Sequence, residues 1–193
     1  QTYQPVVLEG KTVCIVGAGA IGQEIAGLCA GIGMWVVGTR RSRTPADMLP
    51  QFFSRLASPN HLPELLSESD FVAISCQWTP ETDKLFNSEV FAAMKPGSIL
   101  VNVARGEIID EPSLVDALQK GRLRGVVIDV YAGEFDHEPD RRLWDDERVL
   151  ITPHVSSFAD KSRHRGVDLF CENLGAFIEG RTLKNVVDWQ RGY

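Results

Sequence analysis

Residues 12–22 read TVCIVGAGAIG, a short apolar run followed at once by three glycines in the spacing GxGxxG. The run is rich in β-branched residues, which predicts a buried strand at Thr12–Val16. The stretch that follows predicts a helix at Ala20–Ala30. A strand that passes through a glycine turn directly into a helix is typical of an α/β unit that binds a dinucleotide.

Each glycine of this turn has a physical reason to be there. Gly17 permits the tight turn, Gly19 lets the backbone approach a pyrophosphate, and Gly22 lets the helix pack closely on the strand. Free N–H groups in the first turn of the helix, at Ala20 and Ile21, favour a bound phosphate. The loop therefore predicts a cofactor-binding site.

The alternation of apolar runs and helical stretches continues along the chain. Further strands are predicted at Trp35–Thr39, Phe71–Ser75, Ile99–Val103, Val126–Val130 and Val149–Ile151. Further helices are predicted at Pro50–Leu56, Leu62–Ser67, Ser88–Met94, Glu111–Lys120 and Asp160–Glu179. Asp110 is the expected N-cap of the helix at Glu111–Lys120, and Gly121 lies just past its end. The pattern predicts a doubly wound α/β fold with a parallel sheet, the Rossmann arrangement.

The composition is that of one soluble globular domain, with 193 residues, 44% of them hydrophobic and 24% charged. A net charge of −6 argues against nucleic acid or an anionic membrane as a partner. No apolar run reaches the roughly 18 residues that a membrane span needs. Four scattered cysteines and no signal-peptide pattern predict free thiols in a cytoplasmic protein. No His/Cys cluster has the spacing of a metal site.

The end of the second predicted strand bears on the choice of cofactor. An NAD-binding domain usually has an acidic residue there for the ribose hydroxyls, but this chain has Thr39-Arg40-Arg41-Ser42-Arg43. A guanidinium can pair with the 2′-phosphate of NADP, which a carboxylate would repel. We therefore expect NADP(H); the alternative is a solvated arginine loop and NAD(H).

Three strands further along the chain deliver polar residues at their carboxyl ends. The segments read MKPGSILVNVARGE (94–107), GVVIDVYAGE (125–134) and LITPHVSS (150–157). They bring Arg105, Glu134 and His154 to the edge of the sheet at which open α/β sheets bind ligands. This combination predicts a site for anion binding and acid–base chemistry.

With these segments the chain resembles the D-isomer-specific 2-hydroxyacid dehydrogenases, which include glyoxylate/hydroxypyruvate reductases and phosphoglycerate dehydrogenase. The resemblance covers nearly the whole chain and is most specific at KPGSILVNVARGEIID. It implies that Arg105 holds the carboxylate and carbonyl oxygen of the substrate. It implies that His154 is the general acid–base and that Glu134 hydrogen-bonds His154. Relatives usually have proline after this glutamate, whereas Phe135 follows here, so Glu138 of the nearby Glu138-Pro139 pair is the alternative.

The resemblance also implies which residues touch the cofactor beyond the glycine loop. These are Cys76, Gln77, Thr82, Val103, Ala104, Arg105, Asp129, His154 and Ser156; the end of the second predicted strand adds Thr39, Arg40 and Arg41. The implied reaction passes a hydride between nicotinamide and a small 2-oxo or 2-hydroxy acid, in the reductive direction if NADPH is the donor. Relatives are generally homodimers, so a homodimer is expected.

Relatives carry a second, substrate-binding domain built mainly from residues that precede the glycine loop. Only 16 residues precede Gly17 here, so most of that domain is expected to be absent. We expect a dinucleotide-binding domain at 1–182 and a tail at 183–193 that returns towards the missing domain. Such a chain is expected to turn over 2-oxo acids poorly when it is isolated. The alternative is a stand-alone module repurposed for cofactor sensing, partner binding or another reaction.

Overall fold

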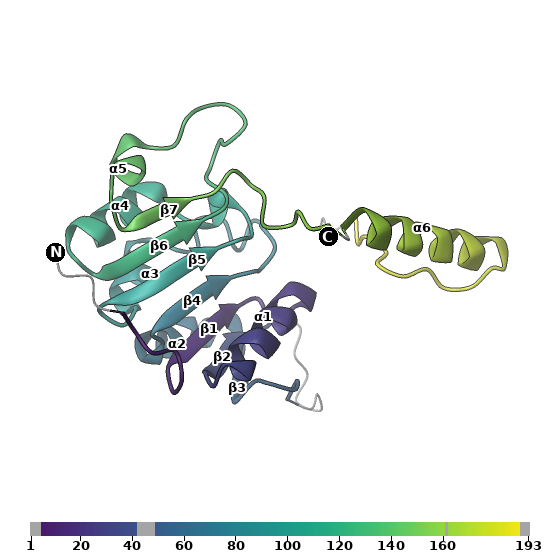
Figure 1. The fold of residues 1–193 in the computed structure, drawn as a ribbon, viewed down its shortest axis with the longest axis horizontal. Helices are drawn as coiled ribbons and strands as arrows, with labels where there is room; N and C mark the ends of the chain where they lie inside the picture. The colour runs from purple at the N-terminus through teal and green to yellow at the C-terminus, as the bar shows by residue number, and fades with distance from the viewer. Residues whose placement is uncertain (1–4, 42–48, 161, 190–193) are drawn as a thin grey trace. The chain divides into compact units, whose positions relative to one another are not determined.

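The computed structural model describes residues 5–41, 49–160 and 162–189, so Arg43 lies outside the described residues. The chain divides into two compact units, Gln1–Pro153 and His154–Tyr193. The first unit is an α/β domain and the second contains the long helix α6 (Ser162–Ile178) (Figure 1).

Seven parallel strands form one sheet in the order β3-β2-β1-β4-β5-β6-β7. The strands are β1 (Thr12–Val16), β2 (Trp35–Thr39), β3 (Arg55–Ala57), β4 (Phe71–Ile74), β5 (Ser98–Asn102), β6 (Leu123–Ile128) and β7 (Val149–Ile151). The chain runs outwards from β1 to β3 and then crosses back to β4 on the other side of β1. The strand order therefore reverses between β1 and β4, and ligands of such sheets bind at the carboxyl edge of this switch point.

Helices cover both faces of the sheet (Figure 1). Those of the first unit are α1 (Ala20–Gly31), α2 (Leu62–Glu68), α3 (Ser88–Ala93), α4 (Glu111–Gln119) and α5 (Arg141–Trp144). Side chains of β1 alternate between the two faces. Cys14 and Val16 join the core that α2, α3 and α4 help to form, whereas Ile15 joins the core under α1, around the buried Ala26. The doubly wound prediction is confirmed.

The expected ends of α4 are also confirmed. The Asp110 carboxylate accepts a hydrogen bond from the Ser113 N–H at 3.2 Å, and Gly121 has a φ of +66° just past the helix. Such a positive φ suits glycine, which has no Cβ to oppose it.

The helix expected at Pro50–Leu56 is wrong. The chain turns at Phe52, whose φ is +82°, and then forms β3 in parallel with β2. Phe53 and Leu56 are buried under α1, and the N–H of Ser54 donates to the Val36 carbonyl at 2.8 Å. Pairing and burial against distant residues therefore override the local helical pattern.

The short helix α5 was not expected from the sequence. The Asp140 side chain caps it by accepting a hydrogen bond from the Arg142 N–H at 2.8 Å. Leu143 anchors this single turn because its side chain is fully buried. Four residues are too few to show a helical period, so the sequence offered only the cap as a signal.

Asp70 ties β1 to β4 at the amino edge of the sheet. Its carboxylate accepts hydrogen bonds from the Thr12 N–H at 3.0 Å and from the Lys95 ammonium at 2.8 Å. Burial alone would raise the pKa of Asp70, but these two bonds, with the charges of Lys95 and Lys11, hold the pKa below its usual value. The carboxylate form is therefore stabilised by folding.

We expect Asp70→Ala to lower the free energy of unfolding by about 1–3 kcal/mol at neutral pH, because the substitution leaves Thr12 and Lys95 without this acceptor. Since folding lowers the pKa of Asp70, its contribution is present above the unfolded pKa of about 4 and is lost as the pH falls through the folded value. Urea unfolding between about pH 7 and pH 3 measures the difference. Asp116→Ala, which removes an exposed pair with Lys120, should cost less than about 0.5 kcal/mol. A loss for Asp70→Ala that is independent of pH would contradict the prediction.

Two glycines of α1 offer a matched pair of substitutions. A Cβ on Gly22 would lie 2.3 Å from the Gly17 carbonyl oxygen, whereas a Cβ on Gly31 would meet nothing within 4 Å. We expect Gly22→Ala to destabilise the fold by about 2–4 kcal/mol through overpacking. Gly31→Ala should be neutral or stabilising by up to about 1 kcal/mol. Chemical unfolding of both variants is the measurement, and equal stabilities would show that α1 does not need the close approach at Gly22.

Candidate functional site

The glycine loop lies at the switch point of the sheet. Gly17 follows β1 with a φ of +101°, and a Cβ on it would lie 2.5 Å from the Cα of Cys76, which follows β4. The N–H groups of Gly17 and Ala18 donate to the carbonyl of Thr39 at the end of β2, at 3.2 and 2.8 Å. The loop is thus packed between the carboxyl ends of β2 and β4.

The residues at the start of α1 fit a pyrophosphate. Gly19 is the N-cap residue and no side chain caps the helix, so the first N–H groups, including those of Ala20 and Ile21, depend on another acceptor. A Cβ on Gly19 would meet nothing within 4 Å, so the space beside it is open. Gly22 is buried against the loop, as the sequence predicted. An uncapped N-terminus beside open space suits an anionic group.

Two arginines follow β2 where the sequence places them. The N–H of Arg40 donates to the Ala57 carbonyl at 3.0 Å, which ties this residue to β3. The side chain of Arg41 is exposed, and its Nη1 lies 4.0 Å from the Oε2 of Glu81, in the loop after β4. Thr39 itself is buried, and its carbonyl serves the glycine loop.

The loop after β4 forms the other side of this region. Burial raises the pKa of the Cys76 thiol to about 11, so this thiol is neutral near pH 7. The hydroxyl of Thr82 donates to the Gln77 carbonyl at 2.7 Å and accepts from the Thr79 N–H at 2.8 Å. Gln77 and Thr82 are therefore held in one tight turn beside Cys76.

Arg105 lies on a turn that is held in place by the buried side chain of Asn102. The buried amide of Asn102 donates to the Arg105 carbonyl at 2.9 Å and accepts from the Ala104 N–H at 3.0 Å. Val103 N–H donates to the Ile74 carbonyl at 3.4 Å, which joins this turn to β4. The Arg105 side chain remains exposed and donates to the Ala104 carbonyl at 2.7 Å. A guanidinium in this position can reach an anionic ligand.

Gly106 brings the segment of Arg105 against the start of the loop after β6. A Cβ on Gly106 would lie 2.0 Å from the carbonyl carbon of Tyr131 and 2.2 Å from the backbone nitrogen of Ala132. The two backbones can meet only because this position has no side chain. Asn102 and Gly106 had no assigned role in the sequence analysis; their place within the long KPGSILVNVARGEIID motif was the only signal.

Asp129 lies at the end of β6 with its carboxylate buried. Its Oδ1 accepts a hydrogen bond from the Thr152 hydroxyl at 2.5 Å, and its N–H donates to the Asn102 carbonyl at 3.0 Å. Asp129 therefore connects the ends of three neighbouring strands, β5, β6 and β7. Its expected contact with nicotinamide stays a prediction.

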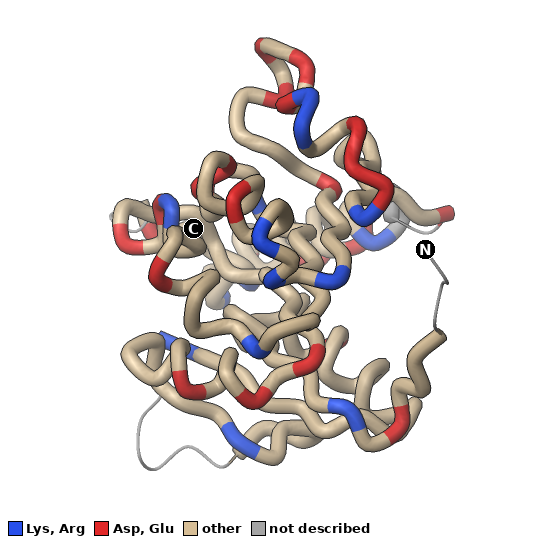
Figure 2. The backbone as a smooth tube through the Cα atoms, turned by 90° about the vertical axis from the view of Figure 1, so that its left-hand side faces the viewer, with Lys and Arg blue, Asp and Glu red and all other residues tan. Residues whose placement is uncertain are grey.

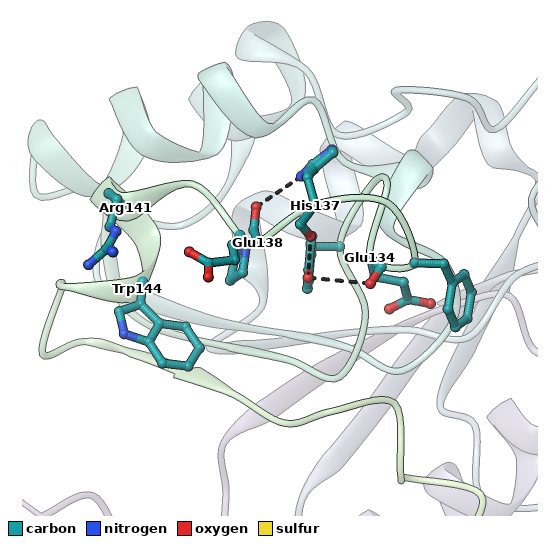
Figure 3. A pocket seen from close by; sticks show the side chains of 8 residues that line it. Glu134, His137, Glu138, Arg141 and Trp144 are labelled. Carbon is teal, nitrogen blue, oxygen red and sulfur yellow. Dashed lines mark hydrogen bonds between the residues drawn. The ribbon is translucent and has the colours of Figure 1, made fainter.

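Glu134 and Glu138 lie in the same loop but on different sides of His137 (Figure 3). The Tyr131 hydroxyl donates to the His137 carbonyl at 2.7 Å and shapes this loop. Glu138 lies on the side of Arg141 and Trp144. The loop and α5 line an open pocket of about 570 Å³. The residues that line it are Tyr131, Glu134, Phe135, His137, Glu138, Pro139, Arg141 and Trp144. The choice between the two carboxylates as the partner of a histidine stays open.

His154 and Ser156 belong to the second compact unit, 154–193. His154 comes three residues after the last residue of β7 and has a φ of +51°. A positive φ is uncommon for a residue other than glycine and clusters at functional sites. This backbone conformation does not by itself assign a function, so the roles of His154 and Ser156 stay predictions.

Basic and acidic residues are mixed along the part of the chain that the structure describes. Figure 2 shows Lys and Arg interspersed with Asp and Glu along the described backbone. An anionic ligand must therefore be held by local groups, such as the N-terminus of α1 and nearby arginines. The four cysteines are free. Within 5–41, 49–160 and 162–189, no three acidic, His or Cys side chains are grouped to hold a metal, and no helix is long and apolar enough for a membrane span.

Comparisons with known proteins identify the family of this chain. The sequence profile of the D-isomer specific 2-hydroxyacid dehydrogenase, NAD binding domain, matches residues 1–156. The chain is 36% identical over 187 residues to a glyoxylate reductase of Thermococcus onnurineus, covering 93% of this chain and 52% of that protein. The chain thus spans about half the length of the curated relatives that it matches.

Two solved structures are similar over the whole chain. A D-isomer specific 2-hydroxyacid dehydrogenase of Xanthobacter autotrophicus in complex with NADPH and MES has a TM-score of 0.87 and 32% identity, with 77% of its chain covered. An NADPH-dependent glyoxylate/hydroxypyruvate reductase of Sinorhizobium meliloti in complex with NADP and sulfate has a TM-score of 0.86 and 28% identity, with 60% of its chain covered. The chain therefore belongs to the D-isomer specific 2-hydroxyacid dehydrogenase family and contains its NAD-binding domain.

Proposed function

We propose that this chain is the cofactor-binding part of an oxidoreductase that passes a hydride between a nicotinamide cofactor and a small 2-oxo or 2-hydroxy acid. The observation that carries the proposal is the uncapped N-terminus of α1, which opens beside Gly19 at the switch point of the sheet. Relatives named glyoxylate and hydroxypyruvate reductase support this substrate class. They also favour an enzyme over a stand-alone sensing module.

NADP(H) is the cofactor that the residues after β2 favour. Arg40 and Arg41 stand where a carboxylate would repel a 2′-phosphate, and a guanidinium can pair with that phosphate through two hydrogen bonds. The similar structures from Xanthobacter and Sinorhizobium contain NADPH and NADP. NAD(H) is the alternative if these arginines are merely solvated.

The bound nicotinamide supplies the hydride, and the chain supplies positioning and a proton. Arg105, exposed on the turn that Asn102 fixes, would hold the carboxylate of the 2-oxo acid and polarise its carbonyl. His154 would give a proton to the oxygen that becomes the hydroxyl. Glu134 would hydrogen-bond His154 and stabilise its protonated form.

The active protein is proposed to be a cytoplasmic homodimer with a substrate domain. Free cysteines support a reducing compartment. Exposed apolar side chains at the end of α1 and the start of β2, namely Leu28, Ile32 and Trp35, are candidate contacts with a second copy.

Titration with NADPH and NADH, followed by nicotinamide fluorescence, tests the cofactor. We expect the wild-type chain to prefer NADPH, and Arg40→Asp to weaken NADPH binding by roughly 10–100-fold while NADH binding is kept or improved. Arg181→Asp, in an exposed pair with Glu179, is the control and should change neither affinity. If the wild-type chain prefers NADH, the proposal of NADP(H) as the cofactor is wrong, whereas the family membership is unaffected.

Single-turnover oxidation of NADPH by glyoxylate, with the chain in excess, detects even the slow reaction expected of the isolated chain and tests the acid–base residues. His154→Gln should slow the reaction by roughly 100-fold or more, and Glu134→Gln by roughly 10–100-fold. For Glu134→Gln, cofactor affinity should stay within about twofold, because the proposed role of Glu134 does not concern cofactor binding. Glu138→Gln is the matched control from the same loop. A large effect at Glu138 and none at Glu134 would reverse their assignment.

A further inference from the structure

An ion pair connects the end of β2 to the loop after β4. The Nη1 of Arg41 lies 4.0 Å from the Oε2 of Glu81, and the two side chains are 46% and 71% exposed. Arg41 is also one of the two arginines proposed to meet the 2′-phosphate of the cofactor. A carboxylate of the same chain therefore already lies close to an arginine that is proposed to bind the phosphate.

Glu81 is held in this position by its own loop. The hydroxyl of Thr79 donates to the Oε2 of Glu81 at 2.7 Å, the same oxygen that faces Arg41. This hydrogen bond is the main cause of a lowered Glu81 pKa, and the charge of Arg41 lowers it further. Glu81 therefore carries its negative charge throughout the pH range in which the cofactor would bind.

Several hydrogen bonds cross the turn that carries Glu81. The hydroxyl of Thr82 bridges the Gln77 carbonyl and the Thr79 N–H at 2.7 and 2.8 Å. The Asp83 N–H donates to the Thr79 carbonyl at 2.9 Å, and the Asp83 carboxylate accepts from the Trp78 indole at 2.9 Å. A carboxylate on such a turn loses little conformational freedom when it pairs with Arg41.

We infer that Glu81 is a specificity-determining residue that weakens the binding of 2′-phosphorylated nucleotides. A 2′-phosphate that pairs with Arg41 must either displace this carboxylate or remain close to it, and both cost affinity. A nucleotide with free ribose hydroxyls meets neither cost. Glu81 thus moderates the NADP(H) preference set by Arg40 and Arg41, and this inference rests on the proposed function.

The expected effect is modest because the pair is exposed and screened by salt. We expect Glu81→Gln to tighten NADPH binding by roughly three- to tenfold and to change NADH binding by less than about twofold. The gain should shrink as salt is raised from about 0.05 to 0.5 M. Glu147→Gln is the matched control, since Glu147 is exposed just before β7 at the opposite edge of the sheet; it should leave both affinities unchanged.

A double-mutant cycle with Arg41→Gln isolates the interaction. If Glu81 acts through Arg41, Glu81→Gln should improve NADPH binding less in the Arg41→Gln background than in the wild type. An equal gain for NADPH in both backgrounds would show that Glu81 weakens binding by direct repulsion of the phosphate, which supports the inference without Arg41. An equal change for NADPH and NADH, or no change, would overturn the inference while the proposed cofactor binding stands. A wild-type chain that binds neither nucleotide would instead overturn the proposed function, and this inference with it.

Discussion

At the junction of β1 and β4 there is no room for a side chain on Gly17. A Cβ on Gly17 would lie 2.5 Å from the backbone of Cys76, and a Cβ on Gly22 would lie 2.3 Å from the Gly17 carbonyl. These two contacts bring the end of β1, the first turn of α1 and the loop after β4 together. Because α1 can then begin directly after the loop, the free N–H groups of its first turn lie at the edge of the sheet where the strand order reverses. The cofactor site is therefore a consequence of close backbone packing.

Sequence reasoning found the elements whose signals are local and missed those that depend on distant partners. The apolar run at Thr12–Val16 and the Asp110 cap are complete within a few residues, so both were predicted correctly. β3 has three residues and exists because it pairs with β2 and buries Leu56 beneath α1. The same distinction holds in the site. Gly106 matters because of Tyr131, and Glu81 because of Arg41, and no local pattern marks either pair.

The charge of the chain makes the anion-binding residues easier to interpret. A net charge of −6 gives no general attraction for a dinucleotide, so affinity must come from short-range groups at defined positions. The first turn of α1 offers backbone donors, and Arg40 and Arg41 are proposed to supply guanidinium groups. Under the proposed function, a local anion such as Glu81 partly offsets these cations, because both act on the same 2′-phosphate at short range.

The VNVARG motif, residues 101–106, is restricted by packing as well as by chemistry. Only Arg105 in this segment is exposed, and its neighbours hold it in place. Asn102 is buried and uses both ends of its amide to close the turn, and Ala104 is nearly buried beneath it. Gly106 lies against the backbone of Tyr131, which starts the loop that carries Glu134. Placing one charged side chain beside another loop thus constrains several other residues of the same turn. A motif of this kind is specific because packing and chemistry restrict different positions of the same turn, and a chance match would have to satisfy both.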